Sequence, residues 1–259
     1  MPSWQALRDE ARRWQDAGRV ADLWWRDDDA AGPDPALDRL LAVQRRTTAP
    51  LALAVVPARA GDALAAHLAT TTGLDVLQHG YDHQNHAPEA EKKCELGPHR
   101  PAMVVLGELG TGWLAMERLF GARALPVLVP PWNRIAPGFV PALPEIGYRG
   151  LSTFGPRRSR RLRGLIEINT HVDLIDWKGG RRFVGVDAAL ATLHAALARA
   201  RETEAEPVGL LSHHLAMDAK SWDFLESVCE MIQNTPGLRL RPARELFAAP
   251  LRTPGEGKS

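Results

Sequence analysis

The densest group of potential metal ligands in the sequence is the segment 78–86, which reads Gln-His-Gly-Tyr-Asp-His-Gln-Asn-His. It holds His79, His83 and His86, and the run 74–78 before it is typical of a short buried strand. Neutral imidazole is the commonest protein ligand for zinc-like metals, and two histidines four positions apart can converge on one ion. A pair of hydrogen-bonded loop histidines is the simpler interpretation, because this spacing is frequent by chance. We predict a metal bound by His79 and His83 with His86 in a supporting position; the pairs His83/His86 and His79/His86 remain alternatives.

Three consecutive aspartates, Asp27, Asp28 and Asp29, follow the predicted buried strand 20–26. Adjacent carboxylates repel one another, so a buried triplet needs a cation, which either Arg26 or a divalent metal could supply. Two histidines and one carboxylate would leave a coordination position for a water that the metal activates, and a second aspartate could take the proton of that water. The alternative is an exposed acidic turn that caps the next helix. Together with the histidine cluster, the triplet favours the metal site.

A histidine pair, His213 and His214, follows the predicted strand 207–211 after one serine. One of the two could act as a general acid that protonates a leaving group, oriented by an aspartate from another strand end. Because neighbouring side chains on a strand point in opposite directions, we expect only one of them to face the site. For either one alone, a hydrogen-bonded histidine at a strand end is the simpler explanation.

Short strands alternate with helices along most of the chain. The expected strands are 20–26, 51–56, 74–78, 125–129, 148–153, one within 165–177, 207–211 and 238–240. The expected helices are 3–18, 35–47, 62–70, 102–120, 138–146, 187–201 and 221–233, and the segment 87–100 is expected to be irregular. This alternation predicts βαβ units and a parallel sheet, either a barrel or a doubly wound sheet.

Polar residues that could do chemistry gather directly after the predicted strands, at 27–29, 79–86, 131–134, 173–176 and 213–214. In a parallel barrel the carboxyl ends of all strands open on one face, where active sites are built from the loops that follow. The arrangement therefore predicts an enzyme. No glycine-rich phosphate loop follows the first predicted strand, so a nucleotide cofactor is not expected.

Composition describes an ordinary globular protein, with 45% hydrophobic and 24% charged residues, enough apolar surface for a core. The formal net charge of +1 favours neither a nucleic-acid nor a membrane partner. The two cysteines make no disulfide framework, the amino-terminal residues include no apolar signal-like segment, and no apolar run reaches the roughly 18 residues of a membrane span. We expect a cytoplasmic protein with a single domain over 1–250 and a disordered tail over 251–259. The arginine-rich segment 157–163 could bind an anionic substrate, although such runs are more often solvated.

In order and spacing these motifs resemble those of the polysaccharide deacetylases, carbohydrate esterase family four, also called the NodB-homology domain. The resemblance extends from about residue 23 to residue 214 and implies a distorted parallel (β/α) barrel of about seven strands. It implies that Asp28 is the catalytic base and that Asp29, His79 and His83 bind the metal. The register in which Asp27 is the base and Asp28 the ligand remains open.

The later motifs of the family are matched more loosely. The segment Pro130-Pro131-Trp132-Asn133-Arg134 resembles the third motif, which lines the groove and directs a backbone N–H, here that of Trp132, at the oxyanion. In the family an arginine usually precedes the two prolines, where this chain has a valine, and a glycine usually follows the aromatic residue.

The fourth and fifth motifs complete the resemblance. Asp173, Asp176 and Trp177 resemble the fourth motif, which contains an aspartate and a tryptophan. The fifth motif, an apolar strand that ends in the general acid, matches His213, with His214 as the alternative.

The resemblance and the residues together predict a metal-dependent hydrolase that removes an acetyl group from an N-acetylated sugar or glycan precursor. Zinc is the expected ion, and cobalt, nickel or iron also suit the donor set. One alternative is an amidohydrolase with a non-sugar substrate, and another is a barrel that binds a metal or a glycan without catalysis. An iron-dependent oxygenase would also use two histidines and one carboxylate, but the parallel β/α pattern disfavours it. The sequence makes no prediction about the oligomeric state.

Overall fold

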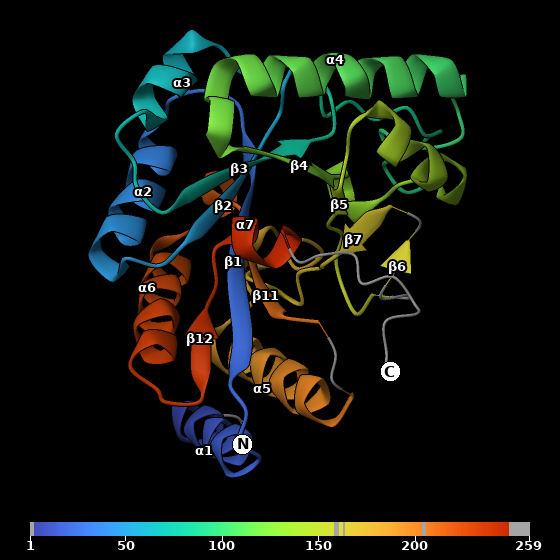
Figure 1. The fold of residues 1–259 in the computed structure, drawn as a ribbon. Coiled ribbons are helices and arrows are strands. Elements are labelled where there is room, and N and C mark those ends of the chain that lie inside the picture. The colour runs from blue at the N-terminus through green and yellow to red at the C-terminus, as the bar shows by residue number, and fades with distance from the viewer. Residues whose placement is uncertain (1–2, 158–160, 163, 204–205, 249–259) are drawn as a thin grey trace, which may run out of the picture.

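The computed structural model describes residues 3–157, 161–162, 164–203 and 206–248, and its central element is a curled β-sheet (Figure 1). The strands follow the order β6-β7-β5-β4-β3-β2-β1-β11-β8, with β12 beside the start of β1. Within this sheet, as far as the chain is described, only β6 and β7 pair in antiparallel fashion. Its strands are β1 (Ala21–Ala30), β2 (Leu51–Val55), β3 (Leu74–His79), β4 (Ala124–Val129), β5 (Gly150–Leu151), β6 (Arg161–Leu162), β7 (Leu165–Glu167), β8 (Val172–Asp173), β11 (Val208–Ser212) and β12 (Leu238–Leu240).

The segment 165–173 joins the two sides of this sheet. At its beginning β7 pairs with β5, and at its end β8 pairs with β11. Between these strands, the N–H of Thr170 donates to the carbonyl of Thr153, and the N–H of His171 donates to the carbonyl of Gly209. One stretch of chain thus bonds to β5 and to β11, and the sheet curls round into a distorted parallel barrel. This confirms the predicted fold class.

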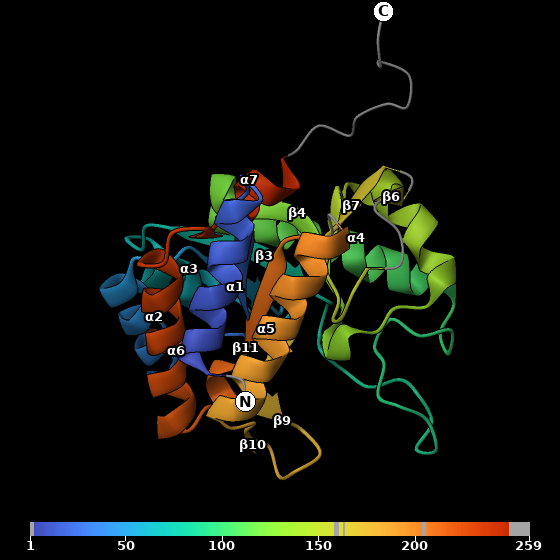
Figure 2. The ribbon, with the colours of Figure 1, turned by 90° about the horizontal axis from the view of Figure 1, so that it is seen from below.

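Helices cover the outside of the barrel. Figure 2 shows α2, α6, α1 and α5 in a row along one side. The helices are α1 (Trp4–Asp16), α2 (Pro35–Thr47), α3 (Asp62–Leu68), α4 (Ala102–Phe120), α5 (Val186–Thr203), α6 (Ala219–Gln233) and the short α7 (Ala243–Phe247). The 3-10 helices are η1 (Gly121–Arg123), η2 (Pro131–Asn133), η3 (Pro137–Ile146) and η4 (His214–Ala216). Asp34 caps the start of α2, since its side chain accepts the N–H of Ala36 at 2.8 Å.

Alternate side chains of β1 pack into two separate apolar clusters. Trp24 belongs to the cluster inside the barrel, with alanines of β2 that leave room for its large ring. Leu23 and Trp25 belong to the cluster between the sheet and the helices. At the amino end of the strands α7 closes the interior, where Arg244 bonds to Asp75 at the start of β3. The carboxyl ends are therefore left for the site.

Several elements differ from their predicted extents. The first strand continues through the aspartate triplet to Ala30, and the single strand expected within 165–177 is divided among β7, β8 and β9 (Ile175–Asp176), which pairs with β10 (Arg182–Phe183). The expected strand 148–153 is reduced to β5. The helix expected over 138–146 is a 3-10 helix, because Pro141 and Pro144 cannot donate α-helical hydrogen bonds. The short α7 was not predicted.

The glycines of α4 do not interrupt it, and this helix has the predicted bounds. One of them has a packing role, because a Cβ atom at Gly112 would lie 2.4 Å from Nε2 of Gln78. The segment 87–100 contains no helix or named strand, as expected.

Other features of the described chain bear on the sequence predictions. Cys94 and Cys229 are free thiols, and burial raises the pKa of Cys229 to about 12. No helix in the described ranges combines the length and the apolar character needed to cross a bilayer. The expected tail 251–259, and residues 158–160 and 163 of the arginine-rich segment, lie outside the described residues.

Candidate active site

The aspartate triplet lies within β1 and not beyond its end, and its side chains point in different directions. Arg26 and Asp28 share the interior face of the barrel, because side chains two positions apart on a strand point the same way. Asp27 lies on the opposite face, toward the helices. Asp29 has a φ of 76° where the register with β2 shifts, and such a break re-aims a side chain. The strand thus directs the three carboxylates to three environments.

Asp29, His79 and His83 meet at the carboxyl ends of β1 and β3. Oδ1 of Asp29 lies 3.1 Å from Nε2 of His79 and 3.1 Å from Nε2 of His83. The ligand atoms of the three residues all lie within 4.8 Å of one another. Over the described part of the chain, this is the one group of three or more His, Cys, Asp and Glu side chains so arranged. Of the three histidine pairs considered from the sequence, the structure therefore brings together His79 and His83.

The chemistry of this group fits a divalent cation. Nδ1 of His79 lies 3.0 Å from the carbonyl oxygen of Val129, which places the ring proton on Nδ1 and the lone pair of the neutral ring on Nε2, toward Asp29. A lone pair facing a carboxylate is repulsive unless a proton or a cation lies between them. Two imidazole nitrogens and one carboxylate oxygen are a donor set for zinc, and also for cobalt, nickel or iron. The residues therefore suit the predicted metal.

The pKa values of His79 and Asp29 without a metal also show that this group favours a positive charge. Burial lowers the pKa of His79, but the hydrogen bond to Asp29 and the neighbouring carboxylates outweigh burial and raise it overall. Burial raises the pKa of Asp29, but hydrogen bonds from His79 and His83 outweigh burial and bring it far below its ordinary value. A bound divalent cation would supply the positive charge that protons supply in its absence.

Asp28 adjoins Asp29 of the candidate ligand group and is held by Arg26. Nε and Nη2 of Arg26 donate to the two oxygens of Asp28 at 2.8 and 2.9 Å. The same guanidinium donates to Oγ of Ser152 at 2.6 Å and to Oδ1 of Asn133 at 2.7 Å. Both members of the pair are buried. Arg26 is also anchored across the barrel to Ser152, the residue after β5, and its bidentate contact fixes the orientation of the Asp28 carboxylate.

His213 approaches the same centre from the end of β11. Its Nδ1 lies 3.7 Å from Oδ1 of Asp173, and the ring of Trp177 meets it edge-on with centroids 4.7 Å apart. The indole N–H of Trp177 donates to the other oxygen of Asp173 at 2.8 Å. Burial raises the pKa of Asp173, and the adjacent His213 only partly opposes that rise. Asp173 and Trp177 thus fix the position of the His213 ring.

No model of a known protein family matches the sequence, and no curated protein matches it. Solved structures do match the fold. A putative polysaccharide deacetylase from Mycobacterium smegmatis is 16% identical, with a TM-score of 0.63, and the match covers 89% of this chain and 90% of that one. A family 4 acetyl xylan esterase from Clostridium thermocellum, in complex with a cobalt ion, is 13% identical, with a TM-score of 0.54 over 88% of this chain and 90% of that one. A CE4 family pseudoenzyme from Bacillus anthracis is 14% identical, with a TM-score of 0.56 over 88% of this chain and 66% of that one.

The chain has the fold of the family 4 carbohydrate esterases. This confirms the fold that the motif order predicted. Since a protein described as an acetyl xylan esterase and one described as a pseudoenzyme share this fold, the function must be argued from the side chains.

In this deacetylase fold, η2 carries the residues that resemble the third motif. The ring of Trp132 packs on that of His83 with centroids 4.4 Å apart. Trp132 and Asn133 have φ angles of 54° and 56°, a left-handed conformation that bulky residues such as Trp rarely adopt. Pro131 is buried against Gly80 of the histidine loop, and Nη1 of Arg134 donates to the carbonyl of Lys93 at 2.7 Å.

Asp176 and His86, both predicted site residues, take no part in this cluster. Oδ1 of Asp176 accepts the N–H groups of Lys178 and Gly179, so this carboxylate closes the turn between β9 and β10. His86 is not in the ligand group, and its N–H donates to the carbonyl of Cys94. It lies on the same loop as the ligands but does not join them.

Asp27 forms a separate buried network with His214. Its Oδ1 lies 2.5 Å from Nδ1 of His214, and its Oδ2 accepts from Oγ of Ser212 at 2.6 Å and from the N–H of His214 at 3.0 Å. Burial lowers the pKa of His214, but Asp27 outweighs burial and raises it overall. Asp27 is therefore occupied with holding the start of η4 against β1.

We expect Asp27→Asn to destabilise the protein without removing its metal. An amide can accept only part of these hydrogen bonds, and leaving one buried donor unsatisfied costs about 1–3 kcal/mol. Urea denaturation measures the loss, and elemental analysis measures the metal. Asp29→Asn serves as the comparison and should show the reverse pattern. Loss of metal from Asp27→Asn would restore the alternative register, in which Asp27 and Asp28 are the functional pair.

Glu95 is a site residue that sequence analysis missed. Its buried carboxylate lies beneath the metal-ligand loop, where Oε1 accepts the consecutive backbone N–H groups of Tyr81, Asp82 and His83 at 3.2, 2.8 and 3.2 Å. Successive N–H groups that converge on one anion hold a loop in a single conformation. The sequence shows only a glutamate in an irregular segment. Its burial, which marks it as important, cannot be read from the sequence.

Gly80 makes this contact possible. It has a φ of 57°, and a Cβ atom at this position would lie 2.0 Å from Oε2 of Glu95 and 2.5 Å from Cγ of Pro131. Only glycine lets the loop pass between these two side chains. The glycine in the middle of the histidine motif is thus required by packing.

We expect Glu95→Gln to weaken metal binding about 10–100-fold, the usual cost of removing a group that supports a metal ligand. The uncharged amide binds the three N–H groups less strongly, so His83 is held less firmly. Titration with Co²⁺, followed by its visible absorption, measures the affinity, and thermal denaturation of the metal-free protein measures stability separately. Glu91→Gln is the matched control, because Glu91 lies on the same loop and pairs with His99 on the surface. Equal affinities of the two variants would contradict the role of Glu95.

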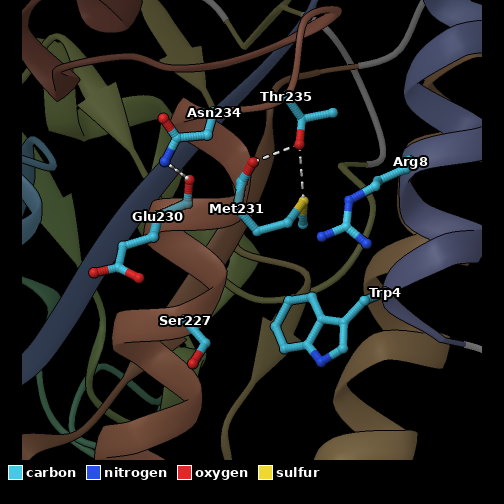
Figure 3. Close-up of a pocket in the computed structure, with 7 residues that line it drawn as sticks. All are labelled: Trp4, Arg8, Ser227, Glu230, Met231, Asn234 and Thr235. Atoms are coloured by element: carbon cyan, nitrogen blue, oxygen red, sulfur yellow. Dashed lines mark hydrogen bonds between the residues drawn. The ribbon is translucent and has the colours of Figure 1, made fainter.

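A pocket between α1 and α6 lies at the other end of the barrel (Figure 3). Trp4 and Arg8 form one wall, and Glu230, Met231 and Thr235 form the other. Thr235 precedes β12, which pairs with the first residues of β1, so this pocket adjoins the amino ends of the strands. In parallel barrels that end contributes to stability and the carboxyl end to chemistry. We assign no function to this pocket.

Proposed function

We propose that the protein is a metal-dependent hydrolase that removes an acetyl group from an N-acetylated sugar or glycan precursor. The convergence of Asp29, His79 and His83 at the carboxyl end of a parallel barrel, directly beside Asp28, carries this proposal. The fold is shared with proteins described as deacetylases of polysaccharides and of peptidoglycan.

Asp29, His79 and His83 would hold the metal, for which we propose zinc. When bound, a divalent cation supplies a Lewis acid for the carbonyl oxygen and lowers the pKa of a bound water. Cobalt, nickel and iron are compatible with the same ligands. Glu95 and the carbonyl of Val129 orient the two histidines.

Asp28 takes the proton of the attacking water in this proposal. The carboxylate must keep one orientation while it does so, and Arg26 holds it through two hydrogen bonds. Because Arg26 is anchored to Ser152 and Asn133, the base is supported from the end of β5 and from η2 as well as from its own strand.

Trp132 stabilises the developing negative charge on the carbonyl oxygen through its backbone N–H. Its neighbours Asn133 and Arg134 donate their own N–H groups to the carbonyls of Pro130 and Pro131. The left-handed conformation of Trp132 sets the direction of this group beside His83. An N–H held in advance where charge develops lowers the barrier.

His213 protonates the departing amine. Asp173 and Trp177 lie against its ring, and His213 follows β11 whereas Asp28 lies on β1, so the proton donor and the proton acceptor come from different strands. His214 is committed to Asp27, so we propose His213 as the acid.

A panel of N-acetylated sugars and small amides, assayed for released acetate and amine with the zinc- or cobalt-loaded protein, tests the proposal. Turnover of an N-acetylated sugar that disappears on removal of the metal supports it. Turnover restricted to non-sugar amides would instead support an amidohydrolase. Metal binding without any turnover would place the protein with the pseudoenzymes of this fold.

A further inference from the structure

A pocket of about 610 Å³ lies between η3 and the outer face of the barrel. Ile135, Val140, Leu151 and Phe154 give it apolar walls, and Asn133 lies at its edge. Its volume is within the usual range for pockets that bind small organic molecules.

The pocket is one strand away from the catalytic base. Leu151 faces outward into the cluster under η3, while the next residue, Ser152, faces the interior and accepts a hydrogen bond from Arg26. The carbonyl of Thr153, which also lines the pocket, accepts from the same guanidinium at 3.4 Å. Asn133 belongs to the pocket and bonds to Arg26, so one side chain separates the pocket from the Arg26–Asp28 pair.

The polar groups at the pocket wall are largely used within the protein. Oδ1 of Asn133 is bonded to Arg26. Oδ1 of Asn169 accepts from both the N–H and the hydroxyl of Thr153, and its Nδ2 donates to the carbonyl of Gly155. Sugar hydroxyls need hydrogen-bond partners when they leave water. A wall whose polar groups are already paired favours an apolar occupant.

We infer that this pocket binds an apolar substituent of the substrate, attached close to the scissile amide. The substrate class is thus an N-acyl amide that carries an alkyl or aryl group, such as an N-acetylated sugar with an apolar aglycone. The inference rests on the proposed function for the position of the amide. Asn133 connects the two sites, because it lines the pocket and bonds to Arg26, the partner of the proposed base Asp28.

A binding measurement tests the pocket without metal or turnover. N-(4-phenylbutyl)acetamide is titrated against the wild type, Val140→Trp and Val20→Trp by ligand-observed NMR. Val140→Trp fills the pocket, and Val20→Trp is the matched control on an exposed valine before β1. We expect affinity to fall tenfold or more in Val140→Trp only, the loss anticipated when a phenyl group loses its apolar site. Absence of binding to the wild type, or equal binding to Val140→Trp, would overturn the inference.

A second variant protects this test from a folding defect. Phe154→Ala removes an exposed ring from the pocket wall and should weaken binding in the same direction, while thermal denaturation shows that each variant is folded.

A pair of hydroxamates tests whether the pocket adjoins the metal. Hydroxamates chelate divalent cations, so acetohydroxamic acid should bind the zinc-loaded protein equally with and without Val140→Trp. N-Hydroxy-N-(4-phenylbutyl)acetamide, an acetohydroxamate that carries the phenyl group on the amine side as the proposed substrate does, should bind more tightly than acetohydroxamic acid, and this advantage should vanish in Val140→Trp. If neither hydroxamate binds while the acetamide result stands, the proposed metal site has failed and the pocket remains. If both bind but the phenyl group gives no advantage, the pocket does not serve the reacting centre and the inference fails.

Discussion

His79→Ala is expected to leave the protein without tightly bound metal. The substitution removes one of three ligand atoms, and the carboxylate of Asp29 and one imidazole remain. Loss of a group that only supports a ligand already costs about 10–100-fold in affinity, and loss of the ligand itself should cost more. After dialysis, elemental analysis should find about one ion per chain in the wild type and close to none in the variant.

His86→Ala is the matched control for this prediction. His86 lies on the same loop, three residues beyond His83, and is not in the ligand group. Its removal should leave the metal content and the Co²⁺ absorption spectrum unchanged. Full metal content in His79→Ala, or loss of metal from His86→Ala, would show that the ligand assignment is wrong.

Asp28→Asn is expected to lower kcat about 10²–10⁴-fold while the metal stays bound, because removal of a general base typically costs this much. The amide cannot take a proton from water, but it has nearly the shape of the carboxylate and keeps one acceptor for Arg26. The measurement is steady-state kinetics on a substrate from the panel, with metal content determined in parallel. A loss of activity accompanied by a loss of metal would make Asp28 a ligand and not the base.

Asp176→Asn is the control for the second prediction. Asp176 closes a turn near the site, so its replacement tests whether any nearby aspartate is needed. We expect kcat to change little. Because Arg26 is buried and Asp28 is its carboxylate partner, thermal denaturation of Asp28→Asn must accompany the kinetics.

The sequence by itself determined the parallel β/α fold and the position of the proposed metal site. Apolar runs of strand length alternate with periodic helices, and this pattern alone implies that the strand ends share one face. His79 and His83 are only four positions apart at the end of one strand, so local geometry alone can bring their side chains together. These features depend on short stretches of chain, so they can be inferred without knowing what packs against them.

Only the tertiary structure decided how the three aspartates divide their tasks. The side-chain alternation of β1 continues as far as Asp28 because β2 and β11 pair with the strand up to Asp27, and this pairing turns Asp27 toward His214 and Asp28 into the barrel. Arg26 meets Ser152, more than a hundred positions away in the chain, and Glu95 fits beneath the histidine loop only because Gly80 lets it approach. Such contacts join segments that are distant in the sequence and that meet only because the sheet curls. Residue spacing therefore does not predict them, and the residues that support the site can be identified only from the tertiary structure.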